Sequence, residues 1–230
     1  MTHTSPQRID SPGRGTRRLL ITAGPTHEPI DAVRFLGNRS SGRVGVALAD
    51  EAARRGWDVT LLLGPAPRQP SDSRVRVRRF RTATDLEALL GEETPGADVL
   101  IMAAAVADYR PKVDPQFFGG KFRRKNEVLT LQLEPTPDLL AGVASRRRPD
   151  QFMVGFALEP REELLASARA KLERKKVDLV VGNPLETMDG ETIEAMVLGK
   201  DGTEVRTPGA IDKVAFAGWL MQIIDERTGK

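Results

Sequence analysis

The chain has 230 residues and no cysteine, an absence that removes several chemistries at once. Without a thiol there is no disulfide, no zinc site with cysteine ligands and no cysteine nucleophile. Long apolar runs are also missing, since no stretch of about 18 apolar residues occurs, and no membrane span is expected. Only 5% of the residues are aromatic, so the core is predicted to be mainly aliphatic.

The N-terminus lacks the apolar segment of a secretory signal peptide, which argues for a cytoplasmic protein. Ser, Pro, Gly and Arg are frequent in residues 1–17 and predict a disordered tail. Residues 18–230 have the length of a single α/β domain, and 40% hydrophobic residues are enough for a sizeable core.

The net charge is small, with 35 Lys and Arg against 32 Asp and Glu, although the basic residues are clustered. Such clusters can mark a surface that binds nucleic acid. Here they alternate with acidic residues, and one Tyr and two Trp leave little aromatic surface for stacking bases. A small polyanion such as a nucleotide therefore fits the pattern better than a nucleic acid does.

Strand and helix patterns alternate along the chain. This alternation predicts an α/β fold with a doubly wound, mostly parallel, Rossmann-like sheet and helices on both faces. Strands are expected at 19–22, 57–63, 74–80, 98–105, 127–133, 151–156 and 177–181. Helices are expected at 44–55, 82–90, 137–144 (with Thr136 as N-cap), 159–176 and 211–224. A small C-terminal β-hairpin is expected around the turn Lys200–Gly202.

The stretch from Ile21 to Gly45 is the most informative part of the chain. A short strand stops at Gly24, a long polar connection follows, and a glycine- and serine-bearing segment leads into a helix. Free N–H groups and the helix dipole favour an anion at such a helix start. Neither GxGxxG nor GxxxxGK[ST] is present, so an ordinary Gly/Ser helix cap remains the alternative.

Three further segments carry candidate ligands. Small residues before Asp108 leave room for a flat ligand at a strand end, unless Asp108 only caps the next turn. Lys121 follows two glycines and could clamp phosphates, although a solvated charge run is the simpler interpretation. Lys171 and Lys175 share one helix face and could converge on a triphosphate or be exposed. His27, beside Glu28, could take part in acid–base catalysis, but a histidine in such a loop is more often structural or exposed to solvent.

These pieces together resemble phosphopantothenate–cysteine ligase, also called phosphopantothenoylcysteine synthetase, of coenzyme A biosynthesis. The resemblance rests on ITAGPTHEPIDAVRFLGNRSSGRVG, AAAVADYRP, the basic run at Lys121, PTPDLL, VGFALE and KLERKKVDLVVGN, which follow the family's order. It covers nearly the whole chain except the tail. The family's Lys-x-Lys-Lys reads Lys121-Phe122-Arg123-Arg124 here, and arginine does not have the geometry of lysine.

The resemblance implies a two-step reaction of 4′-phosphopantothenate, CTP and cysteine. The substrate carboxylate attacks the α-phosphate of CTP, and the cysteine amine then displaces CMP from the acyl-cytidylate. Mg²⁺ is expected to accompany the CTP, with metal-ligating residues unknown, and ATP is the alternative nucleotide. A homodimer is implied, in which the C-terminal hairpin is a candidate dimerisation element, as is a stand-alone ligase beside a separate phosphopantothenoylcysteine decarboxylase.

The resemblance also implies roles for individual residues. Asn38 and Lys121 match the catalytic residues. The expected ligands of the substrate phosphate or acyl-nucleotide are Gly37, Asn38, Ser40, Ser41 and Gly42. The expected nucleotide-binding residues are Met102, Ala103, Ala104, Asp108, Lys121, Pro137, Asp138, Leu139, Leu140, Phe156, Lys171 and Lys175, the two last as phosphate-binding lysines.

Two other functions compete with a ligase. A non-catalytic nucleotide sensor or assembly subunit could use the same fold, but it would need neither Asn38 nor Lys121. An NAD(P)-dependent oxidoreductase predicts a compact GxGxxG after the first strand and an acidic residue at the end of the second. The second strand ends instead in Leu62-Leu63-Gly64.

Overall fold

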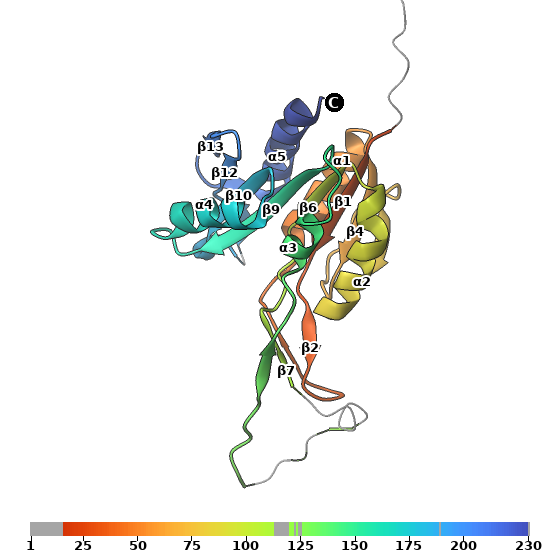
Figure 1. Ribbon diagram of the computed structural model, residues 1–230, viewed down its shortest axis with the longest axis vertical. Coiled ribbons are helices and arrows are strands. Elements are labelled where there is room, and N and C mark those ends of the chain that lie inside the picture. The colour runs from red at the N-terminus through yellow and green to blue at the C-terminus, as the bar shows by residue number, and fades with distance from the viewer. Residues whose placement is uncertain (1–15, 113–119, 122, 124–125, 189, 230) are drawn as a thin grey trace, which may run out of the picture.

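The computed structural model describes residues 16–112, 120, 121, 123, 126–188 and 190–229, and the predicted tail lies almost wholly outside them. An eight-stranded sheet in the order β13-β12-β10-β9-β6-β1-β4-β5 forms its centre (Figure 1). The strands are β1 (Arg18–Ala23), β4 (Asp58–Leu63), β5 (Arg76–Arg79), β6 (Val99–Met102), β9 (Phe152–Glu159), β10 (Leu179–Pro184), β12 (Met196–Gly199) and β13 (Glu204–Arg206).

The first six of these strands in chain order are parallel, which confirms the predicted Rossmann-like sheet. The chain builds outward from β1 to β4 and β5, and then returns to the other side of β1 with β6, β9 and β10. The strand order therefore reverses between β1 and β6. In open α/β sheets, ligands bind beyond the carboxyl ends of the strands at such a switch point.

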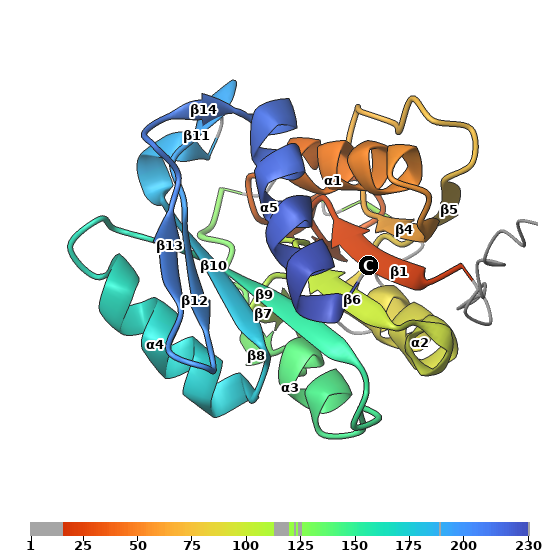
Figure 2. The same cartoon turned by 90° about the horizontal axis from the view of Figure 1, so that it is seen from above.

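Helices cover both faces of the sheet, as predicted (Figure 2). Side chains of β1 alternate between the faces: Leu19 and Ile21 pack with one set of helices, and Leu20 packs with the other. The first set is α1 (Arg43–Arg54) and α5 (Lys213–Thr228), and the second is α2 (Ala83–Glu93), α3 (Leu139–Ala144) and α4 (Leu164–Lys175). Short 3-10 turns are η1 (Thr94–Gly96) and η3 (Leu185–Thr187).

Two helix starts differ from the prediction. Helix α3 begins at Leu139, because the side chain of Asp138 and not that of Thr136 caps it, accepting the Ala141 N–H at 3.1 Å. Helix α4 begins at Leu164, not at Glu159, because β9 continues through Glu159 in register with β10.

The long connection after β1 and the segment after β6 form an arm that extends away from the sheet (Figure 1). It consists of two antiparallel pairs, β2 (His27–Pro29) with β3 (Phe35–Gly37) and β7 (Tyr109–Pro111) with β8 (Leu133–Pro135). The predicted strand at 127–133 is wrong, because only Leu133–Pro135 pairs and Val128 is 93% exposed.

The C-terminal hairpin is confirmed as β12 and β13, which extend the sheet in the antiparallel sense around the Lys200–Gly202 turn. A second small pair joins β11 (Thr192–Ile193) to β14 (Ile211–Asp212), just before α5. Among the described residues, no helix is long and apolar enough to cross a membrane.

Candidate active site

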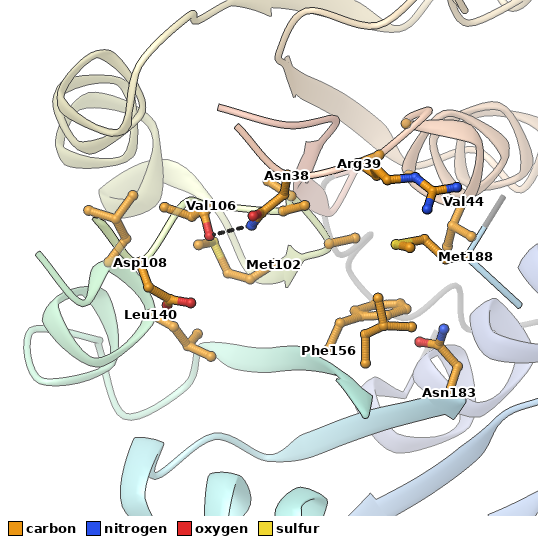
Figure 3. A pocket seen from close by; sticks show the side chains of 18 of the residues that line it. Asn38, Arg39, Val44, Met102, Val106, Asp108, Leu140, Phe156, Asn183 and Met188 are labelled. Atoms are coloured by element: carbon orange, nitrogen blue, oxygen red, sulfur yellow. Dashed lines mark hydrogen bonds between the residues drawn. The ribbon is translucent and has the colours of Figure 1, made fainter. Parts of the chain in front are cut away.

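A cavity of about 810 Å³ opens at the carboxyl ends of β1, β6 and β9, where the sheet reverses its strand order. Its walls come from the start of α1, the segment after β6, the start of α3, the last turns of α4, and the turn after β10 (Figure 3). The predicted residues that line it are Gly37, Asn38, Ser40, Ser41, Gly42, Met102, Ala103, Ala104, Asp108, Pro137, Asp138, Leu139, Leu140, Phe156, Lys171 and Lys175.

The start of α1 has the features expected of an anion site. Gly42 is the N-cap with φ of +70°, a left-handed conformation that glycine adopts without strain, and no side chain caps the helix. The first turn contains no acidic residue, so the positive end of the helix dipole faces the cavity unopposed by its own helix. A Cβ on Gly45 would lie 2.3 Å from the Ala23 Cβ, so Gly45 allows α1 to pack directly on β1.

Asn38 connects the two segments that meet at the switch point. Its Nδ2 donates to the backbone oxygen of Val106 at 2.9 Å, as the dashed line in Figure 3 shows. The neighbouring N–H groups of Ala103 and Ala104 donate to Thr22, at 3.2 Å to its backbone oxygen and at 3.1 Å to its hydroxyl. These N–H groups are therefore used within the fold, and the alanines line the cavity with small side chains.

At one end of the cavity, which we call the α4 end, cations and carboxylates are mixed. Lys175 forms an ion pair with Asp138, and the Lys171 ammonium donates to the backbone oxygen of Phe156. Burial lowers the pKa of both ammonium groups, and the nearby carboxylate of Asp108 opposes that shift in each case. Asp108 and Glu159 also line the cavity, so this end is nearly balanced in charge.

The opposite end, the α1 end, is formed by Arg39, Val44, Asn183, Met188 and Lys213 (Figure 3 labels the first four). Arg43 also lines it and forms an ion pair with Glu191. The acidic groups among the described lining residues lie at the α4 end, and the α1 end is therefore the more positive. Reasoning from the sequence assigned none of these residues a role. Arg39, Val44 and Asn183 lie within recognised motifs but have no special pattern of their own, and Met188 and Lys213 lie outside any recognisable motif.

The chain matches the family described as "DNA/pantothenate metabolism flavoprotein C-terminal domain", abbreviated DFP, over residues 15–227. The chain belongs to this family. The match spans the sheet, helices α1 to α4, nearly all of α5 and the described walls of the cavity.

Individual relatives agree with this assignment. The chain is 42% identical over 200 residues to a protein of Mycobacterium bovis named "Coenzyme A biosynthesis bifunctional protein CoaBC", covering 82% of this chain and 47% of the relative. A second relative, from an unknown prokaryotic organism, is named "Cysteine/Cysteine sulfinic acid decarboxylase" and is 38% identical over 215 residues. The match covers 90% of this chain and 59% of that relative. The chain thus spans about half the length of the curated relatives that it matches.

A solved structure described as the C-terminal domain of CoaBC is also similar. Its TM-score is 0.77 at 31% identity, and the match covers 92% of this chain and 95% of that chain. The DFP fold with its long arm and C-terminal hairpin is therefore shared over almost its whole length.

Lys121 is the one predicted site residue of this DFP domain that does not line the cavity. It is exposed, and the backbone oxygen of Gly120 before it accepts the Ala32 N–H at 3.0 Å, at the tip of the β2–β3 hairpin. Residues 113–119, 122, 124 and 125 of this segment lie outside the described residues. His27 does not line the cavity either, and its ring is stacked on Phe35 with ring centroids 3.6 Å apart.

Within the described part of the chain, no group of three or more His, Asp or Glu side chains could hold a metal ion. The cavity carboxylates are Asp108, Asp138 and Glu159, and Asp138 is already paired with Lys175. These residues do not form a site that would hold a metal ion on its own. A metal ion that is already bound to phosphate oxygens needs fewer protein ligands.

Proposed function

We propose that this DFP domain is a phosphopantothenate–cysteine ligase of coenzyme A biosynthesis. In the first step, the carboxylate of 4′-phosphopantothenate attacks the α-phosphate of CTP, which forms an acyl-cytidylate and releases pyrophosphate. In the second, the amine of cysteine attacks the acyl carbon, forms an amide and releases CMP. The observation that carries the proposal is one cavity that joins an uncapped helix N-terminus to the switch point of the sheet.

The two ends of the cavity suit different parts of a nucleotide. The α1 end offers backbone N–H groups, the hydroxyls of Ser40 and Ser41, and cations, a set of donors that suits phosphate oxygens. The α4 end combines carboxylates with ammonium groups, and this mixture suits the neutral hydrogen-bonding groups of a base and ribose. We therefore assign the phosphates to the α1 end, whereas the sequence resemblance assigned them to Lys171 and Lys175.

Asn38 lies between these two ends, where the reacting groups of both substrates would meet. Because its Nδ2 is held by Val106, its Oδ1 is oriented by the same contact. Such a fixed amide can position the acyl-nucleotide without a change of rotamer. Lys121 remains a candidate for the cation that stabilises the charge developing on the α-phosphate.

Mg²⁺ is proposed to enter with the triphosphate, because Mg²⁺ in nucleotide sites is bound by phosphates with one or two carboxylates. Because the cavity carboxylates Asp108 and Glu159 lie at the α4 end, phosphate oxygens would supply most of its ligands at the α1 end. Bound in this way, the ion would neutralise phosphate charge. CTP is the proposed nucleotide, with ATP as the alternative.

A pyrophosphate-release assay tests the proposal. Wild-type protein with Mg²⁺, CTP and 4′-phosphopantothenate should release pyrophosphate without cysteine, at least as a burst of one equivalent per site. The same assay with ATP in place of CTP determines which nucleotide the protein uses. A nucleotide sensor would bind CTP without releasing pyrophosphate, and an NAD(P) oxidoreductase would respond to neither nucleoside triphosphate.

A homodimer is proposed to form through the arm. In the described part of the arm, the exposed large hydrophobic side chains are those of Val33, Phe35, Tyr109, Val128, Leu129, Leu131 and Leu133. Exposed apolar side chains gathered on one part of a molecule are typical of protein interfaces. Leu129→Asp should then give a monomer in light scattering, whereas Val205→Asp on the C-terminal hairpin should leave the dimer intact. The reverse result would assign dimerisation to the hairpin.

A decarboxylase that consumes the ligase product is the proposed partner. The CoaBC relatives are named bifunctional, and this chain matches about half of their length. The other half, or a separate protein, would supply that second activity. A cytoplasmic location stays a prediction.

A further inference from the structure

One arginine at the α4 end differs from the two lysines beside it in its contacts. Arg174 lies in the last turn of α4 and lines the cavity together with Lys171 and Lys175. The ammonium groups of both lysines are held by partners within the fold. Within the part of the chain that the structure describes, the exposed Arg174 guanidinium forms neither a hydrogen bond nor an ion pair. Neither the motifs nor the resemblance assigned a role to this arginine.

Two carboxylates at the same end are also available to a ligand. Asp108 follows β6 and Glu159 ends β9, and both residues line the cavity. Neither carboxylate accepts a hydrogen bond from a described residue, whereas that of Asp138 is bound by Lys175 and by the Ala141 N–H. The α4 end therefore offers one donor group and two acceptor groups that the fold does not use.

These three charged groups lie close to one another around Lys171. Burial lowers the pKa of the Lys171 ammonium, the carboxylates of Glu159 and Asp108 oppose that shift, and the guanidinium of Arg174 adds to it. All three groups thus interact electrostatically with the same ammonium group, on the same part of the cavity wall.

This mixture of groups favours a neutral ligand with both acceptors and donors. A phosphate would pair with Arg174, but the carboxylates of Asp108 and Glu159 would repel it. A heterocyclic ring that carries acceptors and a donor on one edge satisfies the guanidinium and a carboxylate together. Within a nucleotide that ring is the base, which the proposed function also assigns to the α4 end.

The geometry of a guanidinium distinguishes the two nucleotides that the ligase proposal leaves open. Its N–H groups form a rigid planar fork that matches two acceptors lying side by side. Cytosine has such a pair in O2 and N3, followed on the same edge by the N4 amino donor. In adenine, the N1 acceptor is flanked by the N6 amino donor and by a C–H group, so the fork finds one acceptor only.

We propose that Arg174 selects CTP over ATP by donating to O2 and N3 of cytosine, while the carboxylate of Asp108 or Glu159 accepts from the N4 amino group. The proposal rests on the proposed ligase function for the presence of a nucleotide, and it adds the residue that recognises the base. Arg174 acts here as a specificity-determining contact and takes no part in proton transfer.

Isothermal titration of Arg174→Lys with CTP, ATP and inorganic tripolyphosphate tests the proposal. Lysine keeps the charge but lacks the planar fork. Wild type should bind CTP more tightly than ATP. The variant should lose about tenfold or more in affinity for CTP, the scale of a hydrogen bond to a charged group, with little change for ATP and tripolyphosphate. Arg174→Met should lose at least as much affinity for CTP.

Two controls lie on the same helix but outside the cavity lining. Arg169→Lys changes an exposed arginine of α4, and Lys176→Met changes the exposed C-cap of α4. Both variants should bind CTP and ATP as wild type does, and thermal unfolding of every variant reports on folding. Wild type that prefers ATP, an unchanged CTP affinity in both Arg174 variants, or equal losses for CTP and ATP would overturn the proposal. Equal losses in Arg174→Met that Arg174→Lys restores would instead assign the guanidinium to the phosphates.

Failure of the ligase function is distinguishable from failure of this proposal, because binding requires no reaction. Selective CTP binding that depends on Arg174, without pyrophosphate release from CTP, would contradict the ligase and support the base contact. Pyrophosphate release with a preference for CTP that persists in Arg174→Lys would support the ligase and contradict the base contact.

Discussion

The two ends of the cavity both contain cations but differ in the backbone and the acidic groups beside them. At the α4 end, Lys175 pairs with Asp138 and Lys171 donates to a carbonyl oxygen, so the charge of these lysines is largely compensated within the fold. At the α1 end, the cations also have partners, as in the ion pair of Arg43 with Glu191, but a helix start without a side-chain cap lies beside them. The difference teaches that a helix start without a side-chain cap, more than the presence of basic residues, indicates where an anion binds.

Lys121 belongs to neither end, and it gives the largest predicted effect. If it stabilises charge on the α-phosphate only during attack, Lys121→Gln should slow acyl-cytidylate formation by about 10²-fold or more, with a much smaller change in CTP affinity. Single-turnover pyrophosphate release measures the rate. Arg123→Gln is the matched control and should slow the reaction less. An inactive Arg123→Gln variant together with an active Lys121→Gln variant would assign the role to Arg123.

The packing of the two ends can be compared at two glycines. Gly45→Ala at the α1 end would place a Cβ 2.3 Å from the Ala23 Cβ, and it should lower the free energy of unfolding by about 1–3 kcal/mol. Gly142→Ala in α3, at the α4 end, meets nothing within 4 Å. It should raise the free energy of unfolding by about 0.5–1 kcal/mol. Denaturant titration of both variants measures these changes. Equal stabilities of Gly45→Ala and Gly142→Ala would show that α1 does not depend on close contact with β1.

Asn38 joins the two ends, and Asn38→Asp should disturb their alignment. The substitution replaces the Nδ2 donor with a carboxylate oxygen that faces the Val106 oxygen, and it also places a negative charge near the phosphates. Turnover should fall by about tenfold or more, the scale of one lost polar contact in a charged site. CTP affinity should change less, and mass spectrometry should detect accumulated acyl-cytidylate. Wild-type turnover would remove Asn38 from the reaction.

The smallest predicted effect concerns the pH dependence of stability at the α4 end. Burial lowers the pKa of Lys171, whereas lysine in an unfolded chain titrates near about 10.4. The unfolded state therefore binds more protons between the lowered pKa and that value, and the free energy of unfolding should rise with pH across this window. Lys171→Met should reduce the rise, and Lys176→Met should not. An unchanged slope in Lys171→Met would mean that Lys171 is as well solvated as an exposed lysine.

Local patterns in the sequence predicted the parts of the site that local structure builds. The strand, glycines and helix start around Gly42 form one continuous segment, and their placement could be inferred from spacing alone. Arg39 lies beside Asn38 but has no special pattern, and Lys213 reaches the cavity only because α5 packs on α1. Such residues come together through the topology of the whole sheet.

The arm shows a different limit. The alternating pattern at 127–133 predicts a strand with one buried face, yet most of its apolar side chains are exposed in a single chain. A pattern of this kind encodes an apolar face but not what covers that face. The cap at Asp138 was missed for a simpler reason, because Thr136 and Pro137 are equally typical of a helix start.

Pyrophosphate–nucleotide exchange tests the two-step ligase reaction most directly. Wild-type protein is incubated with labelled pyrophosphate, Mg²⁺, CTP and 4′-phosphopantothenate, with cysteine omitted. A reversible acyl-cytidylate predicts label in CTP that depends on 4′-phosphopantothenate and appears without cysteine. No exchange with CTP or ATP, or exchange that requires cysteine, would contradict an acyl-nucleotide intermediate in this cavity.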